Sequence, residues 1–143
     1  MLRHRIDQGR VDTLRRLELF RSCNDHSIDL LARTIDEEVV FPAGKLLCDQ
    51  GKPAQCCYIV LEGEVEVRVA GEPVATVRAG HTVGERGVLG RAPRNATVVA
   101  ATEVRVYRLN DSRLRKLTNT APGVISALQY ESNRREAAIA TAS

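Results

Sequence analysis

Residues 84–97, which read GERGVLGRAPRNAT, contain the side chains best suited to ligand chemistry in this chain of 143 residues. Glycines let a backbone approach a ligand closely, and one helical turn in GERGVLG could point its unpaired amides at an anion. Arg94 follows a proline of fixed φ, and its guanidinium suits a phosphate. Glu85 would repel an isolated anion, so we expect it to accept a hydrogen bond from a hydroxyl beside the phosphate.

A ligand that meets both requirements carries one compact anionic group next to a hydroxyl. A cyclic nucleotide, with its phosphodiester and its ribose 2′-OH, is such a ligand. The alternative is a surface loop in which Glu85 and Arg94 form an ion pair of little energetic weight. These residues alone leave both interpretations open.

The spacing of apolar residues predicts the helices and strands around this segment. Residues 10–36 show helical spacing, and Asn24 or Asp25 can cap the second of two helices. Residues 37–109 alternate instead, as in EVEVRVA (64–70), which is typical of half-buried strands. Turn glycines punctuate these strands at intervals of 7 to 12 residues: Gly44, Gly51, Gly63, Gly71 and Gly80. This pattern predicts an antiparallel sandwich or barrel.

Residues 111–140 return to helical spacing, so helices flank the strands on both sides. Asp111 can cap a short turn, and Pro122 occupies a first-turn position. The last helix is predicted to bury an apolar side opposite the charged segment ESNRRE (131–136).

Composition excludes several classes of protein. With 43% hydrophobic and 27% charged residues, the chain has a globular profile, and a net charge of +3 is too mild to suggest a nucleic-acid binder. Because no apolar run approaches the roughly 18 residues of a bilayer span and the N-terminus lacks a signal core, we expect a cytoplasmic protein without membrane insertion. The four cysteines lack metal-finger spacing, and Cys56 and Cys57 are expected to be buried thiols.

Two longer stretches carry a family resemblance. VGERGVLGRAPRNATVVA (83–100) resembles the phosphate-binding cassette of cyclic nucleotide-binding domains, and residues 41–67 are similar to the opening strands of that family. The resemblance implies a mainly β fold, an antiparallel jelly-roll β-barrel (double-stranded β-helix) with N-terminal helices and C-terminal lid helices. We expect a single domain over 1–143, with the barrel at 37–109 and the cassette at 83–98.

The resemblance also implies a ligand-binding set: Gly84, Glu85, Arg86, Gly87, Arg94, Asn95, Ala96 and Thr97. Glu85 would bind the ribose 2′-OH, and Arg94 would pair with the cyclic phosphate. Arg86 replaces a residue that is apolar in the family, and it either points to solvent or adds a second positive charge near the phosphate. Asn95 could reach a purine edge, so the choice between cAMP, which we place first, and cGMP stays open.

Family members use the helix after the barrel as a lid. Here the lid would be 122–140, with Leu128 or Tyr130 packing on the purine; alternatively, Leu128 seals the helix onto the barrel and Tyr130 faces solvent. The expected function is a regulatory sensor that binds a cyclic nucleotide, with no catalytic residues, no cofactor and no metal. It would act through an effector protein or self-association.

Two other functions fit a chain of this kind. A barrel that does not bind nucleotide could serve as a docking or oligomerisation module, and Arg86 is the residue that favours this alternative. Jelly rolls also host metal sites with about three His or carboxylate ligands. His81 and Glu85 are the only suggestive pair for such a site.

Overall fold

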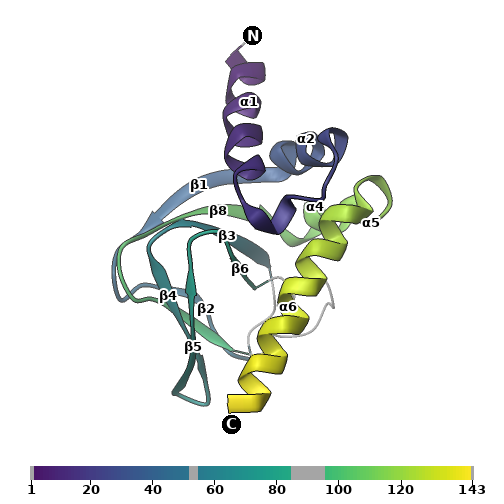
Figure 1. Cartoon of the computed structure of the whole chain (residues 1–143). Coiled ribbons are helices and arrows are strands. Elements are labelled where there is room, and N and C mark those ends of the chain that lie inside the picture. The colour runs from purple at the N-terminus through teal and green to yellow at the C-terminus, as the bar shows by residue number, and fades with distance from the viewer. Residues whose placement is uncertain (1, 52–54, 85–95, 143) are drawn as a thin grey trace.

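The computed structural model describes residues 2–51, 55–84 and 96–142, with side-chain surroundings over 8–51, 55–84 and 96–134. Helices lie at both ends of the chain and the strands lie between them (Figure 1). The helices are α1 (Leu2–Arg15), the 3₁₀ helix η1 (Glu18–Phe20), α2 (Asp25–Thr34), α4 (Asp111–Arg115), α5 (Leu117–Thr120) and α6 (Pro122–Ala142). The strands are β1 (Ile35–Phe41), β2 (Leu46–Cys48), β3 (Cys56–Glu62), β4 (Glu64–Val69), β5 (Glu72–Arg78), β6 (Thr82–Val83), β7 (Thr97–Ala100) and β8 (Val104–Asn110).

The strands form two four-stranded sheets, with orders β1-β8-β3-β6 and β2-β7-β4-β5. Every described pairing is antiparallel, which confirms the predicted mainly β fold with flanking helices. The predicted closure is absent from the described strands, because these sheets stay separate instead of joining into one barrel. A core of apolar side chains from both sheets, including Val60, Val65 and Val106, lies between them.

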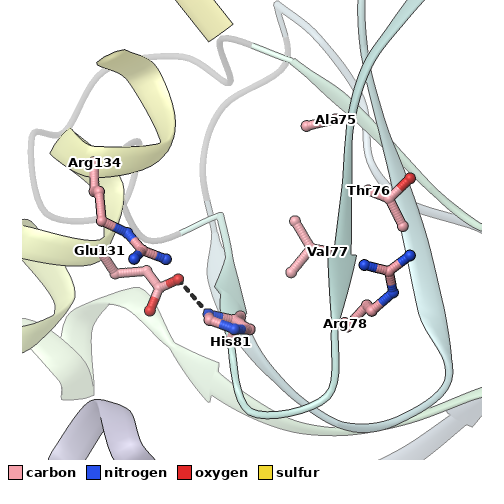
Figure 2. A pocket seen from close by; sticks show the side chains of 7 residues that line it. All are labelled: Ala75, Thr76, Val77, Arg78, His81, Glu131 and Arg134. Carbon is pink, nitrogen blue, oxygen red and sulfur yellow. Dashed lines mark hydrogen bonds and ion pairs between the residues drawn. The ribbon is translucent and has the colours of Figure 1, made fainter. Parts of the chain in front are cut away.

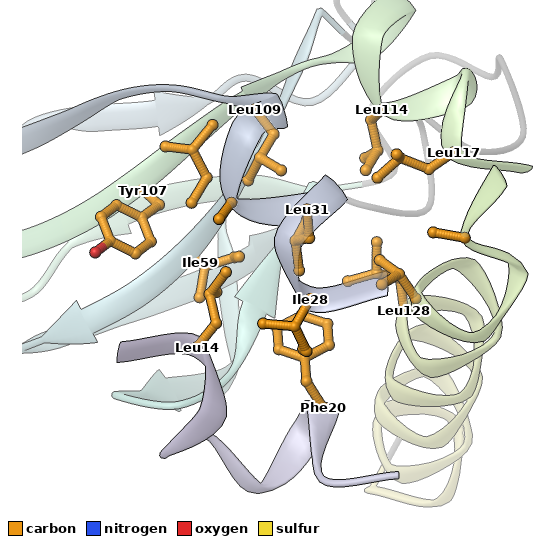
Figure 3. Close-up of a cluster of buried hydrophobic side chains, with 14 of the residues drawn as sticks. Leu14, Phe20, Ile28, Leu31, Ile59, Tyr107, Leu109, Leu114, Leu117 and Leu128 are labelled. Carbon is orange, nitrogen blue, oxygen red and sulfur yellow. The ribbon is translucent and has the colours of Figure 1, made fainter. Parts of the chain in front are cut away.

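A second core joins the helices to the outer face of the β1-β8-β3-β6 sheet. Strand β3 is buried along most of its length because Ile59 points to the helices, while Tyr58 and Val60 belong to the core between the sheets. Figure 3 shows the helix-side cluster: Leu14, Phe20, Ile28, Leu31, Ile59, Tyr107, Leu109, Leu114, Leu117 and Leu128. The first half of α6 is therefore part of this helix-side core, through residues such as Leu128.

Local signals in the sequence place most of these elements correctly. Asn24 caps α2, accepting a hydrogen bond from the Ser27 amide at 2.8 Å, and α6 begins at Pro122 as predicted. All five turn glycines have positive φ. Gly63 is the most constrained of them, because a Cβ there would lie 2.3 Å from the Glu103 carbonyl oxygen.

Four expectations need correction. Helix α1 begins at residue 2 and not at 10, and the cap of α4 is Asn110, whose side chain accepts from the Ser112 amide, one residue before the predicted Asp111. The strands β2 and β6 had not been predicted, because each has only two or three residues and shows too little alternation. Finally, Glu131 and Ser132 are buried, although the pattern had assigned them to the charged side of the last helix.

Candidate functional site

The structure describes three of the eight predicted ligand-binding residues. Gly84 follows β6 with a φ of +84°, which glycine adopts without strain. Ala96 packs against the core between the sheets. Thr97 opens β7, and its hydroxyl accepts a hydrogen bond from the Gln50 amide at 3.0 Å. The other five, namely Glu85, Arg86, Gly87, Arg94 and Asn95, lie outside the described residues.

A pocket of about 470 Å³ lies between β5 and α6, next to the strand that leads to Gly84. Ala75 and Val77 lie on the side of β5 that faces α6, whereas Thr76 lies on the opposite side of the strand (Figure 2). His81 and Glu131 close the pocket opposite β5. The pocket volume falls within the range of about 300–1,000 Å³ that is usual for small-ligand sites.

Polar groups sit at the edges of this pocket. Glu131 of α6 accepts a hydrogen bond from Nδ1 of His81 at 2.7 Å, and the Glu131 side chain is only 9% exposed (Figure 2). Arg78 is held at the other edge by Glu64, with a nitrogen–oxygen distance of 2.6 Å. Arg134 completes the lining from α6 and is exposed. An apolar strand wall flanked by both donors and acceptors suits a flat, polar-edged ligand such as a heteroaromatic base.

The two lid candidates lie in different surroundings. Leu128 is 2% exposed and belongs to the core that joins α6 to the other helices and the sheet. Tyr130 is 69% exposed and lines a wider groove between α6 and η1. Neither residue is among the side chains that line the pocket beside β5.

The residues from α6 that do line that pocket, Glu131 and Arg134, had not been predicted as site residues. The available signal was the helical period. Glu131 follows Leu128 by three positions and Val124 by seven, so it shares their buried side. A carboxylate on such a side needs a partner, because burying an unpaired charge is costly. That partner is His81, for which the sequence offers a metal site with Glu85 or a surface position.

The structure also bears on metal-ligating side chains, on the adjacent cysteines and on membrane-spanning helices. Among the described residues, no three His, Cys, Asp or Glu side chains gather as a metal site would require. Cys56 and Cys57 are buried, as expected. The Cys56 thiol and the Tyr58 hydroxyl form a hydrogen bond at 3.2 Å, and burial raises the pKa of Tyr58, so the phenol stays protonated. No helix in the described part of the chain has the length and hydropathy that crossing a membrane demands.

Comparison with known proteins identifies the family of this chain. Residues 38–121 match the family model of the cyclic nucleotide-binding domain. The cAMP-dependent protein kinase regulatory subunit of Emericella nidulans is 30% identical over 121 residues, which cover 83% of this chain and 29% of that protein. The chain thus spans under a third of the length of that curated relative.

Solved structures show the same arrangement of helices and sheets. The structure of cAMP-bound PfPKA-R superposes with a TM-score of 0.83 at 15% identity, over 96% of this chain and 48% of the other. The regulatory subunit of a cAMP-independent protein kinase A from Trypanosoma cruzi, bound to guanosine, superposes with a TM-score of 0.74 at 26% identity, over 91% and 49%. With a family model that matches more than half of its length, this chain belongs to the cyclic nucleotide-binding domain family.

Proposed function

We propose that this chain is a regulatory module that binds a cyclic purine nucleotide between β5, the cassette and α6. The observation that carries the proposal is the pocket beside β5, whose lining includes His81, three residues before Gly84 of the cassette. The base would lie along Ala75 and Val77, where it could exchange water for an apolar wall. The sugar and phosphate would extend toward residues 84–97.

Each cassette residue has a separate role in this proposal. Arg94 pairs with the cyclic phosphate, Glu85 accepts from the ribose 2′-OH, and backbone amides near Gly87, Asn95 and Ala96 add hydrogen bonds to the anion. Arg86 has no contact with the nucleotide in this proposal. The nucleotide is cAMP or cGMP, with cAMP placed first because the relative from Emericella nidulans is named for cAMP.

Output passes through α6 to an effector protein or to a second copy of the chain. Regulatory relatives, such as the kinase subunit from Emericella nidulans, support a regulatory and not a catalytic role. A kinase catalytic subunit is one class of effector that this relative suggests. The docking or oligomerisation module remains the alternative if no nucleotide binds.

Isothermal titration calorimetry with cAMP, cGMP and guanosine tests the proposal. Arg94→Ala should weaken binding of the cyclic nucleotide by about 2–5 kcal/mol, because it removes the partner of a desolvated phosphate. Arg86→Ala is the matched control, and it should change affinity far less. Equal losses in both variants would mean that two arginines hold the phosphate.

Guanosine has no phosphate, so its affinity relative to that of cGMP measures what the phosphate contributes to binding. It is a relevant probe because the protein from Trypanosoma cruzi is bound to that nucleoside. Binding of guanosine at least as tight as that of cGMP would contradict the phosphate site. No heat with any of the three compounds would leave the docking module as the function.

A further inference from the structure

Helix α6 carries an acidic residue on a side that is otherwise built for packing. Among positions 122–134, where burial is described, the buried residues of α6 are Val124, Ile125, Leu128, Glu131 and Ser132. The first three join the helix-side core. Glu131 is 8% exposed, and a carboxylate removed from water this far is costly unless a donor reaches it. Packing alone would be served better by an apolar side chain at this position.

The donor is His81, and hydrogen bonds to strand β3 hold the backbone around it. The Val60 amide donates to the His81 carbonyl at 2.9 Å, and the Gly80 amide donates to the Val60 carbonyl at 2.8 Å. Strand β3 therefore holds the segment 80–81, which continues directly into β6 and then Gly84. Nδ1 of His81 lies 2.7 Å from Oε1 of Glu131, a residue fifty positions away in the sequence.

This pair also separates two hollows on the surface. On one side lies the pocket beside β5, and on the other lies a groove of about 1,100 Å³ between α6 and η1. Both His81 and Glu131 line both hollows. The far wall of the groove includes Leu17 and Leu19, and Tyr130 lines it from α6. Any change in the His81–Glu131 contact must therefore alter the pocket and the groove together.

We propose that the hydrogen bond between His81 and Glu131 is a positioning contact, a latch that sets α6 over the pocket and couples its occupancy to the groove beside η1. The core around Leu128 fixes the first half of α6, whereas the latch fixes the helix one turn further along. When the latch is broken, the Glu131 carboxylate has to leave its buried position to regain water. This moves the second half of α6 away from β5 and opens both hollows. The ligand side of this inference rests on the proposed function.

Four variants separate the hydrogen bond from simple packing. His81→Asn keeps an N–H donor near the place of Nδ1, whereas His81→Leu fills space without a donor. Glu131→Gln keeps an acceptor oxygen, and Glu131→Leu places an apolar side chain on a buried helix side. Should His81→Leu fail to fold, Glu131→Leu supplies a second test, because it removes the buried carboxylate together with the hydrogen bond. Helix α6 should then keep its position and its slow exchange, and faster exchange would contradict the latch.

Hydrogen exchange of the nucleotide-free chain gives the direct readout. In His81→Leu, amides of α6 from residue 129 onward should exchange about 5- to 150-fold faster, the range that corresponds to an unsatisfied buried group. His81→Asn should restore most of the protection, and amides of 124–128 should change little. In the double variant His81→Leu with Glu131→Leu, the α6 amides should exchange no faster than in His81→Leu alone, since both changes remove the same interaction. Additive effects, or unchanged exchange in His81→Leu, would overturn the latch.

Calorimetry then tests the coupling to ligand. His81→Leu should weaken the binding of whichever cyclic nucleotide the wild-type chain takes by about 5-fold or more, and His81→Asn should stay within about 2-fold of wild type. Faster exchange with unchanged affinity would overturn the coupling. If the wild-type chain binds neither cAMP nor cGMP, the proposed function fails, but the exchange experiment still decides whether the latch exists.

Discussion

Leu128 and Tyr130 of helix α6 make opposite predictions about stability, although they are only two positions apart. Leu128 is 2% exposed in the helix-side core, whereas Tyr130 is 69% exposed. Leu128→Ala should cost about 2–5 kcal/mol of unfolding free energy, from the lost transfer of the side chain and the cavity left behind. Tyr130→Ala should stay within about 0.5 kcal/mol of wild type, as surface substitutions usually do.

Thermal and urea unfolding, followed by circular dichroism, measure this difference. For a domain of this size, each kcal/mol moves Tm by roughly 2–8 °C, so Leu128→Ala should melt at least about 4 °C below wild type. Because Leu128 lines the core and not the pocket beside β5, its loss should leave the pattern of nucleotide preference unchanged. A neutral Leu128→Ala, or a Tyr130→Ala that destabilises as strongly, would refute the assignment of Leu128 as the residue that seals α6 onto the body of the domain.

Two further predictions concern the sheets. Gly63→Ala should destabilise the chain by more than about 1–2 kcal/mol, because alanine is strained at positive φ and its Cβ would also clash with the Glu103 carbonyl oxygen. Gly71→Ala should cost only the strain of positive φ, since nothing lies within 4 Å of its Cβ. Equal urea midpoints for the two variants would contradict this. The hydrogen bond from Arg105 lowers the pKa of Glu62 in the folded chain. Glu62 therefore contributes stability at pH values above its pKa in the unfolded chain, and this contribution is lost as the pH falls through its lower pKa in the folded chain. In Arg105→Gln the Glu62 resonance should titrate at higher pH by NMR, and an unmoved titration would show that the pair is not formed.

The sequence predicted the elements that carry strong local signals. Alternation in EVEVRVA located β4, the cap at Asn24 located α2, and Pro122 marked the start of α6. The separate sheets and the short strand β6 depend on pairings between distant segments, such as Tyr58 with Val83, which no local pattern encodes. Propensity and periodicity describe neighbours in sequence, so register across the sheet lay beyond them.

The site was predictable to a different extent at its two ends. Residues 84–97 are predicted as a binding segment from residue type, spacing and family resemblance. Of this segment the structure describes Gly84, directly after β6, and Ala96 and Thr97, at the start of β7. The pocket beside β5 was not predicted, because Ala75 and Val77 resemble the residues of any strand and Glu131 belongs to a charged segment. Only the folded chain brings His81 within 2.7 Å of Glu131. Polar residues that line a pocket between distant elements are visible in sequence only as interruptions of an apolar period.

Hydrogen exchange of the wild-type chain, with and without saturating cyclic nucleotide, tests the central claim most directly. The account predicts that cAMP or cGMP protects amides in 84–97 and also amides in 124–135, because the ligand would lie between the cassette and α6. At a hundred times its dissociation constant, the same ligand should stabilise the fold by about 2.7 kcal/mol. Protection confined to 84–97 would leave a binding domain without a responsive helix. Unchanged exchange in both segments at millimolar nucleotide would contradict the claim that this member of the family binds a cyclic nucleotide.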